Sequence, residues 1–156
     1  MPELFNYDKL YSLTHYIIAK FQDVGKKDIS TPLVSTVLHL ADFKSYSIRG
    51  KAITGAEYMM TSDGPIICYG ILDGILGCLR SHRNIAFQNR LSKGIKGYIA
   101  LQDPDLSWFS QEELAIIDQV MVFPYINYNQ GYWQFTKAGD NIPYSLCDQY
   151  RGQNGS

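Results

Sequence analysis

The residues of this chain that could carry out acid–base or nucleophilic chemistry are His15, His39, His82 and Cys68. Histidine is the commonest general base in enzymes, and a cysteine thiolate can act as a nucleophile. His15 and His39 fall in two expected helices and could meet across a helix pair. The chain has no HxxxH, HExxH or CxxC pattern, so no metal-ligand spacing surrounds them. We therefore expect histidines that are satisfied within helices, and we predict no catalytic residue, no metal and no cofactor.

A second stretch of chemical interest, residues 80–96, carries only positive charges. No acidic residue occurs between Asp73 and Asp103, and the aromatic Phe87 lies among the cations. Such a stretch could neutralise nucleic-acid phosphates, dock an acidic protein surface, or form a solvated loop that offsets the acidic remainder of the chain. The basic residues are Arg80, Arg83, Arg90, Lys93 and Lys96.

The length and composition indicate one globular domain. The chain has 156 residues, of which 46% are hydrophobic and 19% charged, so it can bury a core of its own. Its formal net charge of -1 gives no overall attraction to nucleic acid or to an anionic membrane. The three cysteines are odd in number and lack CxxC spacing, which suits a reducing compartment. With no leader pattern and no apolar run of membrane-spanning length, we predict a cytoplasmic protein without a membrane partner.

Four helices are expected to position these residues. The first runs over 6–21, where apolar residues recur at intervals of three and four, and the second runs over about 31–48 after a Ser-Thr-Pro cap. The third is expected to begin at Gly64-Pro65, because proline in a first helical turn loses no hydrogen bond. The fourth follows a capping box formed by Ser110 and Glu113.

The remaining segments favour little β structure. Residues 56–60 are expected to be extended or a loop, and residues 97–102 a short strand. These patterns together predict a mainly α fold, a compact single-domain helical bundle with a small β element. The domain is predicted to span 6–147, followed by a flexible C-terminal tail at 148–156.

Four motifs occur in an order that resembles a known family. They are TPLVSTVLHLADF, KAITGAEYMMTSDGPI, DLSWFSQEELAIIDQV and AGDNIPYSL, the last preceded by Trp133. The chain resembles the Panacea domain family, also called the SocA-like or phage-associated protein family, whose members are antitoxin domains of toxin–antitoxin pairs. The resemblance covers about residues 7–147, although 122–141 does not match the family pattern. The matching residues are Ala41, Asp42, Phe43, Ile53, Thr54, Gly55, Tyr58, Gly64, Pro65, Trp133, Ile142, Pro143 and Tyr144.

The resemblance implies a non-catalytic module that binds a partner protein. We predict antitoxin-like neutralisation of a toxin by direct binding, through a surface built from residues 42–64. Two alternatives are a phage-encoded inhibitor of a host defence protein and a nucleic-acid-binding regulator that uses the basic stretch. An enzyme would need a pocket in which His15, His39 and Cys68 converge. The predicted partner contacts are Asp42, Arg49, Lys51, Thr54, Glu57 and Tyr58.

The other matching residues are expected to shape the fold. Asp42 is equally open to a structural role, in which its carboxylate holds the turn after the second helix through backbone hydrogen bonds. Trp133 is expected to fill part of the core. The predicted structural set is Phe43, Ile53, Gly55, Gly64, Pro65, Trp133, Pro143 and Tyr144.

Overall fold

The computed structural model describes residues 4–90, 95–122 and 138–147. In these ranges four α-helices and two small antiparallel sheets combine into an α+β fold. The prediction of a mainly helical bundle is therefore wrong, because strands occupy two segments that were expected to be a helix and a connection. In chain order the elements are α1 (Tyr7–Asp23), α2 (Thr31–Arg49), β1 (Tyr58–Thr61), β2 (Gly64–Ile67), η1 (Cys68–Gly70), α3 (Ile71–Ser81), β3 (Ile85–Arg90), β4 (Ile95–Ala100), α4 (Gln111–Val122) and β5 (Asn141–Ile142).

Local capping signals begin three of the helices close to where they were predicted. The Asn6 side chain accepts a hydrogen bond of 3.0 Å from the backbone of the first turn of α1, and Ser30 caps α2 in the same way. At α4, Ser110 and Glu113 exchange hydrogen bonds of 3.0 and 3.1 Å, which confirms the capping box. None of the helices in the described ranges is both long and apolar enough to cross a membrane.

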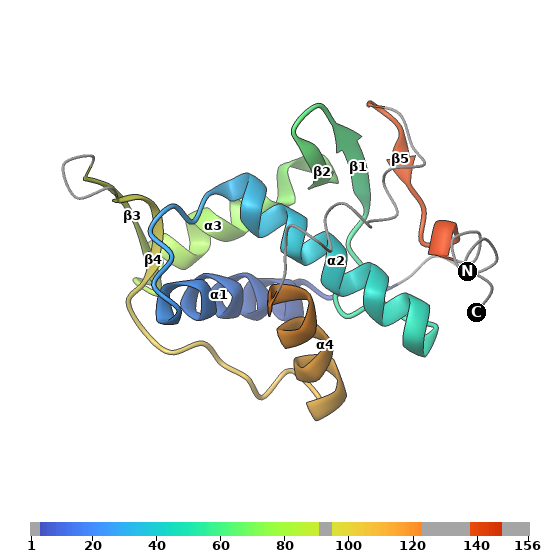
Figure 1. Cartoon of the computed structure of the whole chain (residues 1–156), viewed down its shortest axis with the longest axis horizontal. Coiled ribbons are helices and arrows are strands. Elements are labelled where there is room, and N and C mark those ends of the chain that lie inside the picture. Colours follow the sequence, from blue (N-terminus) through green and yellow to red (C-terminus); the bar gives the residue numbers. More distant parts are fainter. Residues whose placement is uncertain (1–3, 91–94, 123–137, 148–156) are drawn as a thin grey trace.

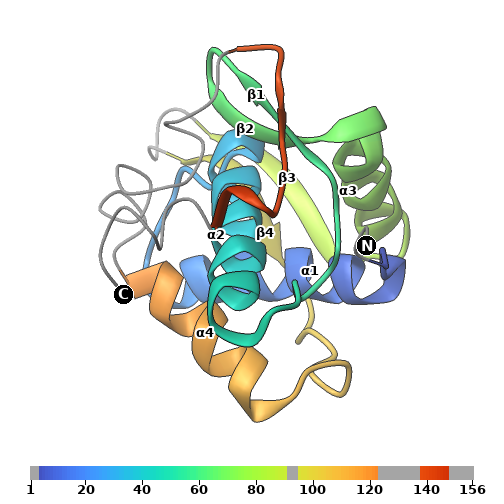
Figure 2. The same cartoon turned by 90° about the vertical axis from the view of Figure 1, so that its right-hand side faces the viewer.

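Helix α2 is the central element of the core (Figures 1 and 2). The β1–β2 hairpin packs on one side of it and α4 on the other, while α1 contacts α2, α3 and β4. One hydrophobic cluster joins side chains from all four helices and from both sheets. The polar side chains of α2 are therefore held between a sheet and a helix.

The segment predicted to start the third helix forms a strand instead. Gly64 and Pro65 lie in β2, which pairs with β1 so that Pro65 faces Met60 across the hairpin. β2 is an edge strand in the order β2-β1-β5, where proline is tolerated because its missing N–H can face outward. Helix α3 begins only at Ile71, because Tyr69 and Gly70 adopt left-handed conformations with φ of 66° and 65°.

The basic stretch also contains a strand that sequence reasoning missed. β3 and β4 form an antiparallel hairpin that extends away from the body of the molecule in Figure 1. Ile85 is buried but Phe87, two residues along the same face, is exposed, so β3 lacks the clear alternation by which strands are recognised. β4 overlaps the short strand predicted over 97–102. Lys93 lies outside the described residues.

Candidate protein-binding surface

Asp42 lies at the centre of a hydrogen-bond network that fixes the turn after α2. One carboxylate oxygen accepts the N–H groups of Ile53 and Thr54 at 2.9 and 2.7 Å. The other accepts the hydroxyls of Thr54 and Tyr58 at 2.5 and 2.7 Å. Burial raises the pKa of Asp42, and these four donors act in the opposite direction by stabilising the carboxylate. The structural role, one of the two predicted for Asp42, is confirmed.

The same burial corrects three of the predicted partner contacts. Asp42 and Thr54 are 0% exposed and Tyr58 is 1% exposed, so a partner cannot touch these side chains in the folded chain. Their polar groups are turned toward one another and hold the backbone of the turn. Of the six predicted contacts, only Lys51 and Glu57 are exposed.

Arg49 is also engaged inside the protein. Its guanidinium lies 3.3 Å from Glu113 Oε2, and Lys9 Nζ lies 2.7 Å from the same oxygen, so α1, α2 and α4 meet at one carboxylate. The side chains of Arg49 and Glu113 are only 10% and 4% exposed. Burial alone would raise the pKa of Glu113, but hydrogen bonds from Lys9 and Ser110 and the Arg49 charge hold it below its usual value. Arg49 is therefore a structural residue, which corrects its prediction as a partner contact.

The residues predicted to shape the fold are mostly packed. Tyr144 donates a hydrogen bond from its hydroxyl to the Ala56 carbonyl oxygen at 2.6 Å, and its ring centre lies 4.7 Å from that of Phe43. Pro143 is exposed, and Trp133 lies outside the described residues. The buried members of the set are Phe43, Ile53, Gly55, Gly64 and Pro65.

Gly55 lies in the turn that Asp42 holds and has a left-handed φ of 76°. A Cβ added there would lie 2.2 Å from the Leu4 carbonyl oxygen, so the backbone would have to shift. We expect Gly55→Ala to lower the free energy of unfolding in urea by about 2 kcal/mol. Gly74→Ala is the matched control, because nothing lies within 4 Å of that position in α3 and alanine favours a helix interior. A Gly55→Ala chain as stable as its parent would contradict this account.

A groove opens where the amino end of α2 meets the β1–β2 hairpin and the start of α3. Its cavity volume is about 370 Å³. The exposed residues Asp63 and Asp73 lie along it and supply two carboxylates. Apolar side chains form much of the remaining wall, contributed by Pro32, Pro65, Ile66, Ile67 and Leu72.

Tyr69 stands at this groove as an exposed aromatic side chain on a strained backbone. The side chain is 83% exposed, and its φ of 66° is one that bulky residues rarely adopt. Such strain persists only where the surrounding structure imposes it. The nearby carboxylate of Glu57 raises the pKa of the Tyr69 hydroxyl, mainly through its negative charge. We call the surface formed by Glu57, Asp63, Ile66, Tyr69 and Asp73 the Tyr69 groove.

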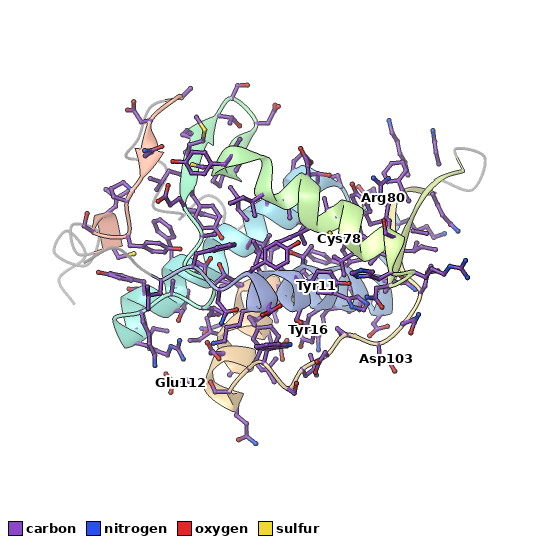
Figure 3. All side chains as sticks on the ribbon, turned by 180° about the vertical axis from the view of Figure 1, so that it is seen from behind. Tyr11, Tyr16, Cys78, Arg80, Asp103 and Glu112 are labelled. Atoms are coloured by element: carbon purple, nitrogen blue, oxygen red, sulfur yellow. The ribbon has the colours of Figure 1, made fainter. Side chains whose placement is uncertain are left out.

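The residues considered for catalysis contact different parts of the fold. His15 Nε2 lies 2.8 Å from a carbonyl oxygen of the segment after β4, whereas His39 is fully buried within α2. His82 Nδ1 lies 2.7 Å from the hydroxyl of Tyr11, which is labelled in Figure 3, and Cys68 is buried in η1. Across the described ranges, no group of three or more His, Cys, Asp or Glu side chains could hold a metal ion.

Three basic side chains of the stretch, those of Arg80, Arg83 and Lys96, are exposed. Arg80 lies near the carboxyl end of α3, where it is labelled in Figure 3, Arg83 lies between α3 and β3, and Lys96 lies in β4. Arg90 ends β3. The described part of the stretch therefore runs from the end of α3 into the paired strands β3 and β4, and its three interpretations stay predictions.

Sequence reasoning missed Tyr69, the most exposed aromatic side chain of the groove. The run ICYGIL was interpreted as continuous apolar helix, which would hide its aromatic residue in the core. The available signal is the glycine directly after Tyr69, because glycine often marks a left-handed backbone position at a helix boundary.

Comparison of the chain with protein-family models, with curated proteins and with solved structures gives no match. Its function is therefore inferred from its own surfaces and from the resemblance carried by its motifs.

Proposed function

We propose that the chain is a non-catalytic, cytoplasmic protein-binding module that neutralises a toxin by direct binding, as an antitoxin does. The observation that supports this best is the Tyr69 groove, where a highly exposed tyrosine is fixed beside an apolar depression. Tyrosine is enriched among the residues that dominate binding free energy at protein interfaces. The resemblance of the motifs to the Panacea domain family supports the same class of function.

The Tyr69 groove fits a partner surface that presents an apolar side chain beside lysine or arginine. Its apolar wall would bury the former, and the carboxylates of Asp63 and Asp73 in the wall, with that of Glu57 beside Tyr69, complement the latter. Lys51 follows the carboxyl end of α2, whereas the groove lies at its amino end. Lys51 is therefore not part of the surface that we propose.

The test is co-expression with the product of the neighbouring open reading frame. Where that product alone stops bacterial growth, we expect the chain to restore growth and to copurify with it. Tyr69→Gly should weaken the complex by about tenfold or more, since truncation of a central tyrosine costs over ~1 kcal/mol. Glycine adopts a φ of 66° without strain, so the stability of the variant should stay within about 1 kcal/mol of the parent.

Val24→Ala is the control for this experiment. Val24 is an apolar residue that is 74% exposed after the end of α1, outside the Tyr69 groove, so its truncation should leave binding unchanged. A toxic neighbour that still stops growth when the chain is present would overturn the proposal for that pair. Parent-like binding by Tyr69→Gly would exclude the groove as the site.

A further inference from the structure

Strand β3 has one edge that pairs with β4 and a second edge that faces away from β4. The Leu101 N–H donates to the Asn84 carbonyl oxygen at 2.8 Å, so this opposed pair is hydrogen-bonded. Because hydrogen-bonded and non-hydrogen-bonded pairs alternate in an antiparallel ladder, every second residue of β3 directs its N–H and C=O away from β4. These residues are Ile85, Phe87 and Asn89.

The corresponding edge of β4 is closed by the segment between α1 and α2. The N–H groups of Lys96 and Tyr98 donate to carbonyl oxygens of residues 27 and 29 at 3.2 and 2.8 Å. The Ala100 N–H donates to the Gln22 side chain at 2.6 Å. The hairpin is therefore covered on this side.

Within the described residues, the edge of β3 lacks such hydrogen bonds, and it is exposed at Phe87 and Asn89 but buried at Ile85. Within the part of the chain that the structure describes, no hydrogen bond reaches the outward amide groups of Ile85, Phe87 or Asn89. Phe87 is 46% exposed and contacts Tyr98 edge to face, with the ring centres 5.2 Å apart. An exposed edge of this kind is a template for another strand, and natural proteins usually shield it.

We propose that the open edge of β3 binds an acidic, extended segment of a partner protein as an added antiparallel or parallel strand. The outward amides would supply main-chain hydrogen bonds, and Phe87 would contact alternate side chains of the segment. The exposed cations Arg80, Arg83 and Lys96 lie on or beside the hairpin, and they select for carboxylates. This surface is separate from the Tyr69 groove, so the inference goes beyond the proposed function (Figure 1).

Charge and geometry favour an acidic strand at this edge over a second copy of the chain and over nucleic acid. A second copy of the chain would bring the same cations against one another across the edge, and like charges at such a contact are unfavourable. The phosphates of a nucleic acid would bind the cations, but a nucleic acid has no peptide backbone to pair with the outward N–H and C=O groups of β3. The open amides and the positive charges are used together only by an acidic strand.

The experiment compares Asn89→Pro with Asn89→Ala in the full chain. Proline removes one outward N–H and is tolerated at such a position of an edge strand, whereas alanine keeps the N–H. The probe is a capped, dye-labelled peptide of alternating glutamate and valine, followed by fluorescence anisotropy. We expect Asn89→Pro to weaken its binding by about tenfold, since an added strand depends on such bonds, and Asn89→Ala to change it by less than about twofold.

Two further measurements keep the result decisive if Asn89→Pro disturbs the hairpin. In the parent chain, the peptide should slow hydrogen exchange of the outward Phe87 amide while that of Gln88, which faces β4, stays as it is. Arg83→Ala with Lys96→Ala should weaken peptide binding and reduce its salt dependence.

Tyr69→Gly should leave peptide binding unchanged, so failure of this inference is distinguishable from failure of the proposed function.

Three outcomes would overturn the inference. Equal peptide binding by the parent and by a folded Asn89→Pro chain would exclude strand addition. A homodimer in solution that Asn89→Pro dissociates would assign the edge to a second copy. Tighter binding of a thymidine oligonucleotide than of the peptide, unaffected by Asn89→Pro, would assign the cations to nucleic acid.

Discussion

Replacing Asp42 with alanine is expected to lower the free energy of unfolding by about 4 kcal/mol, because buried donors lose their charged acceptor. The N–H groups of Ile53 and Thr54 and the hydroxyls of Thr54 and Tyr58 all donate to this carboxylate. With Asp42 fully buried, water cannot replace the lost bonds without opening the turn. Urea denaturation followed by circular dichroism measures the effect.

Two variants make this result specific. Asp42→Asn keeps one oxygen for the two N–H groups, so it should cost roughly half as much. Asp103→Ala removes a carboxylate that is exposed, and its effect should stay within about 0.5 kcal/mol. A loss below about 1 kcal/mol for Asp42→Ala would show that the network does not hold the turn.

The second large effect is a loss of stability in acid caused by His39. Burial lowers the pKa of this imidazole to about 3, against an ordinary value of 6.5. Between these two values the unfolded chain binds a proton that the folded chain does not, so stability falls as the pH falls. From about pH 7 to about pH 4.5 the loss should be about 2.5 kcal/mol from this residue alone.

The pH dependence is tested by its slope. His39→Gln cannot take up the proton, so the free energy of unfolding of this variant should fall less steeply between about pH 6.5 and pH 4. Asp42 lies in the same helix, and the raised pKa of its carboxylate acts oppositely, because the folded chain then binds its proton first. Identical slopes for His39→Gln and its parent would remove His39 as the cause.

The helices were predictable because their signals are local. Asn6, Ser30 and the Ser110–Glu113 box each act within one turn, so the residues beside them in the chain determine where α1, α2 and α4 begin. β4 was predicted in part, but β2 was not, because Gly64-Pro65 fits a helix start as well as an edge strand. Only pairing with β1, which the sequence does not display, decides between them.

The surface that we propose for binding was harder to predict than the fold for a related reason. The motif residues Asp42, Thr54 and Tyr58 were predicted as partner contacts because they are polar and belong to the motifs. Their polar groups hold the turn through hydrogen bonds to one another, so they are buried. Tyr69 belongs to no motif, and its exposure follows from a left-handed backbone between β2 and α3. Glu57 is exposed, and its role as a partner contact stays a prediction.

The position of β1 in its sheet has a consequence for synthesis on the ribosome. β2 follows β1 across a short turn, but β5, the other neighbour of β1, is made only after α4. A nascent chain that has emerged as far as Val122 contains all donors to Asp42, yet one side of β1 still lacks its native strand. Until residues 138–147 emerge, adjacent chains on one messenger RNA can pair through that side. The synthesis of β5 therefore determines when this side of β1 is no longer available for pairing with a neighbouring nascent chain.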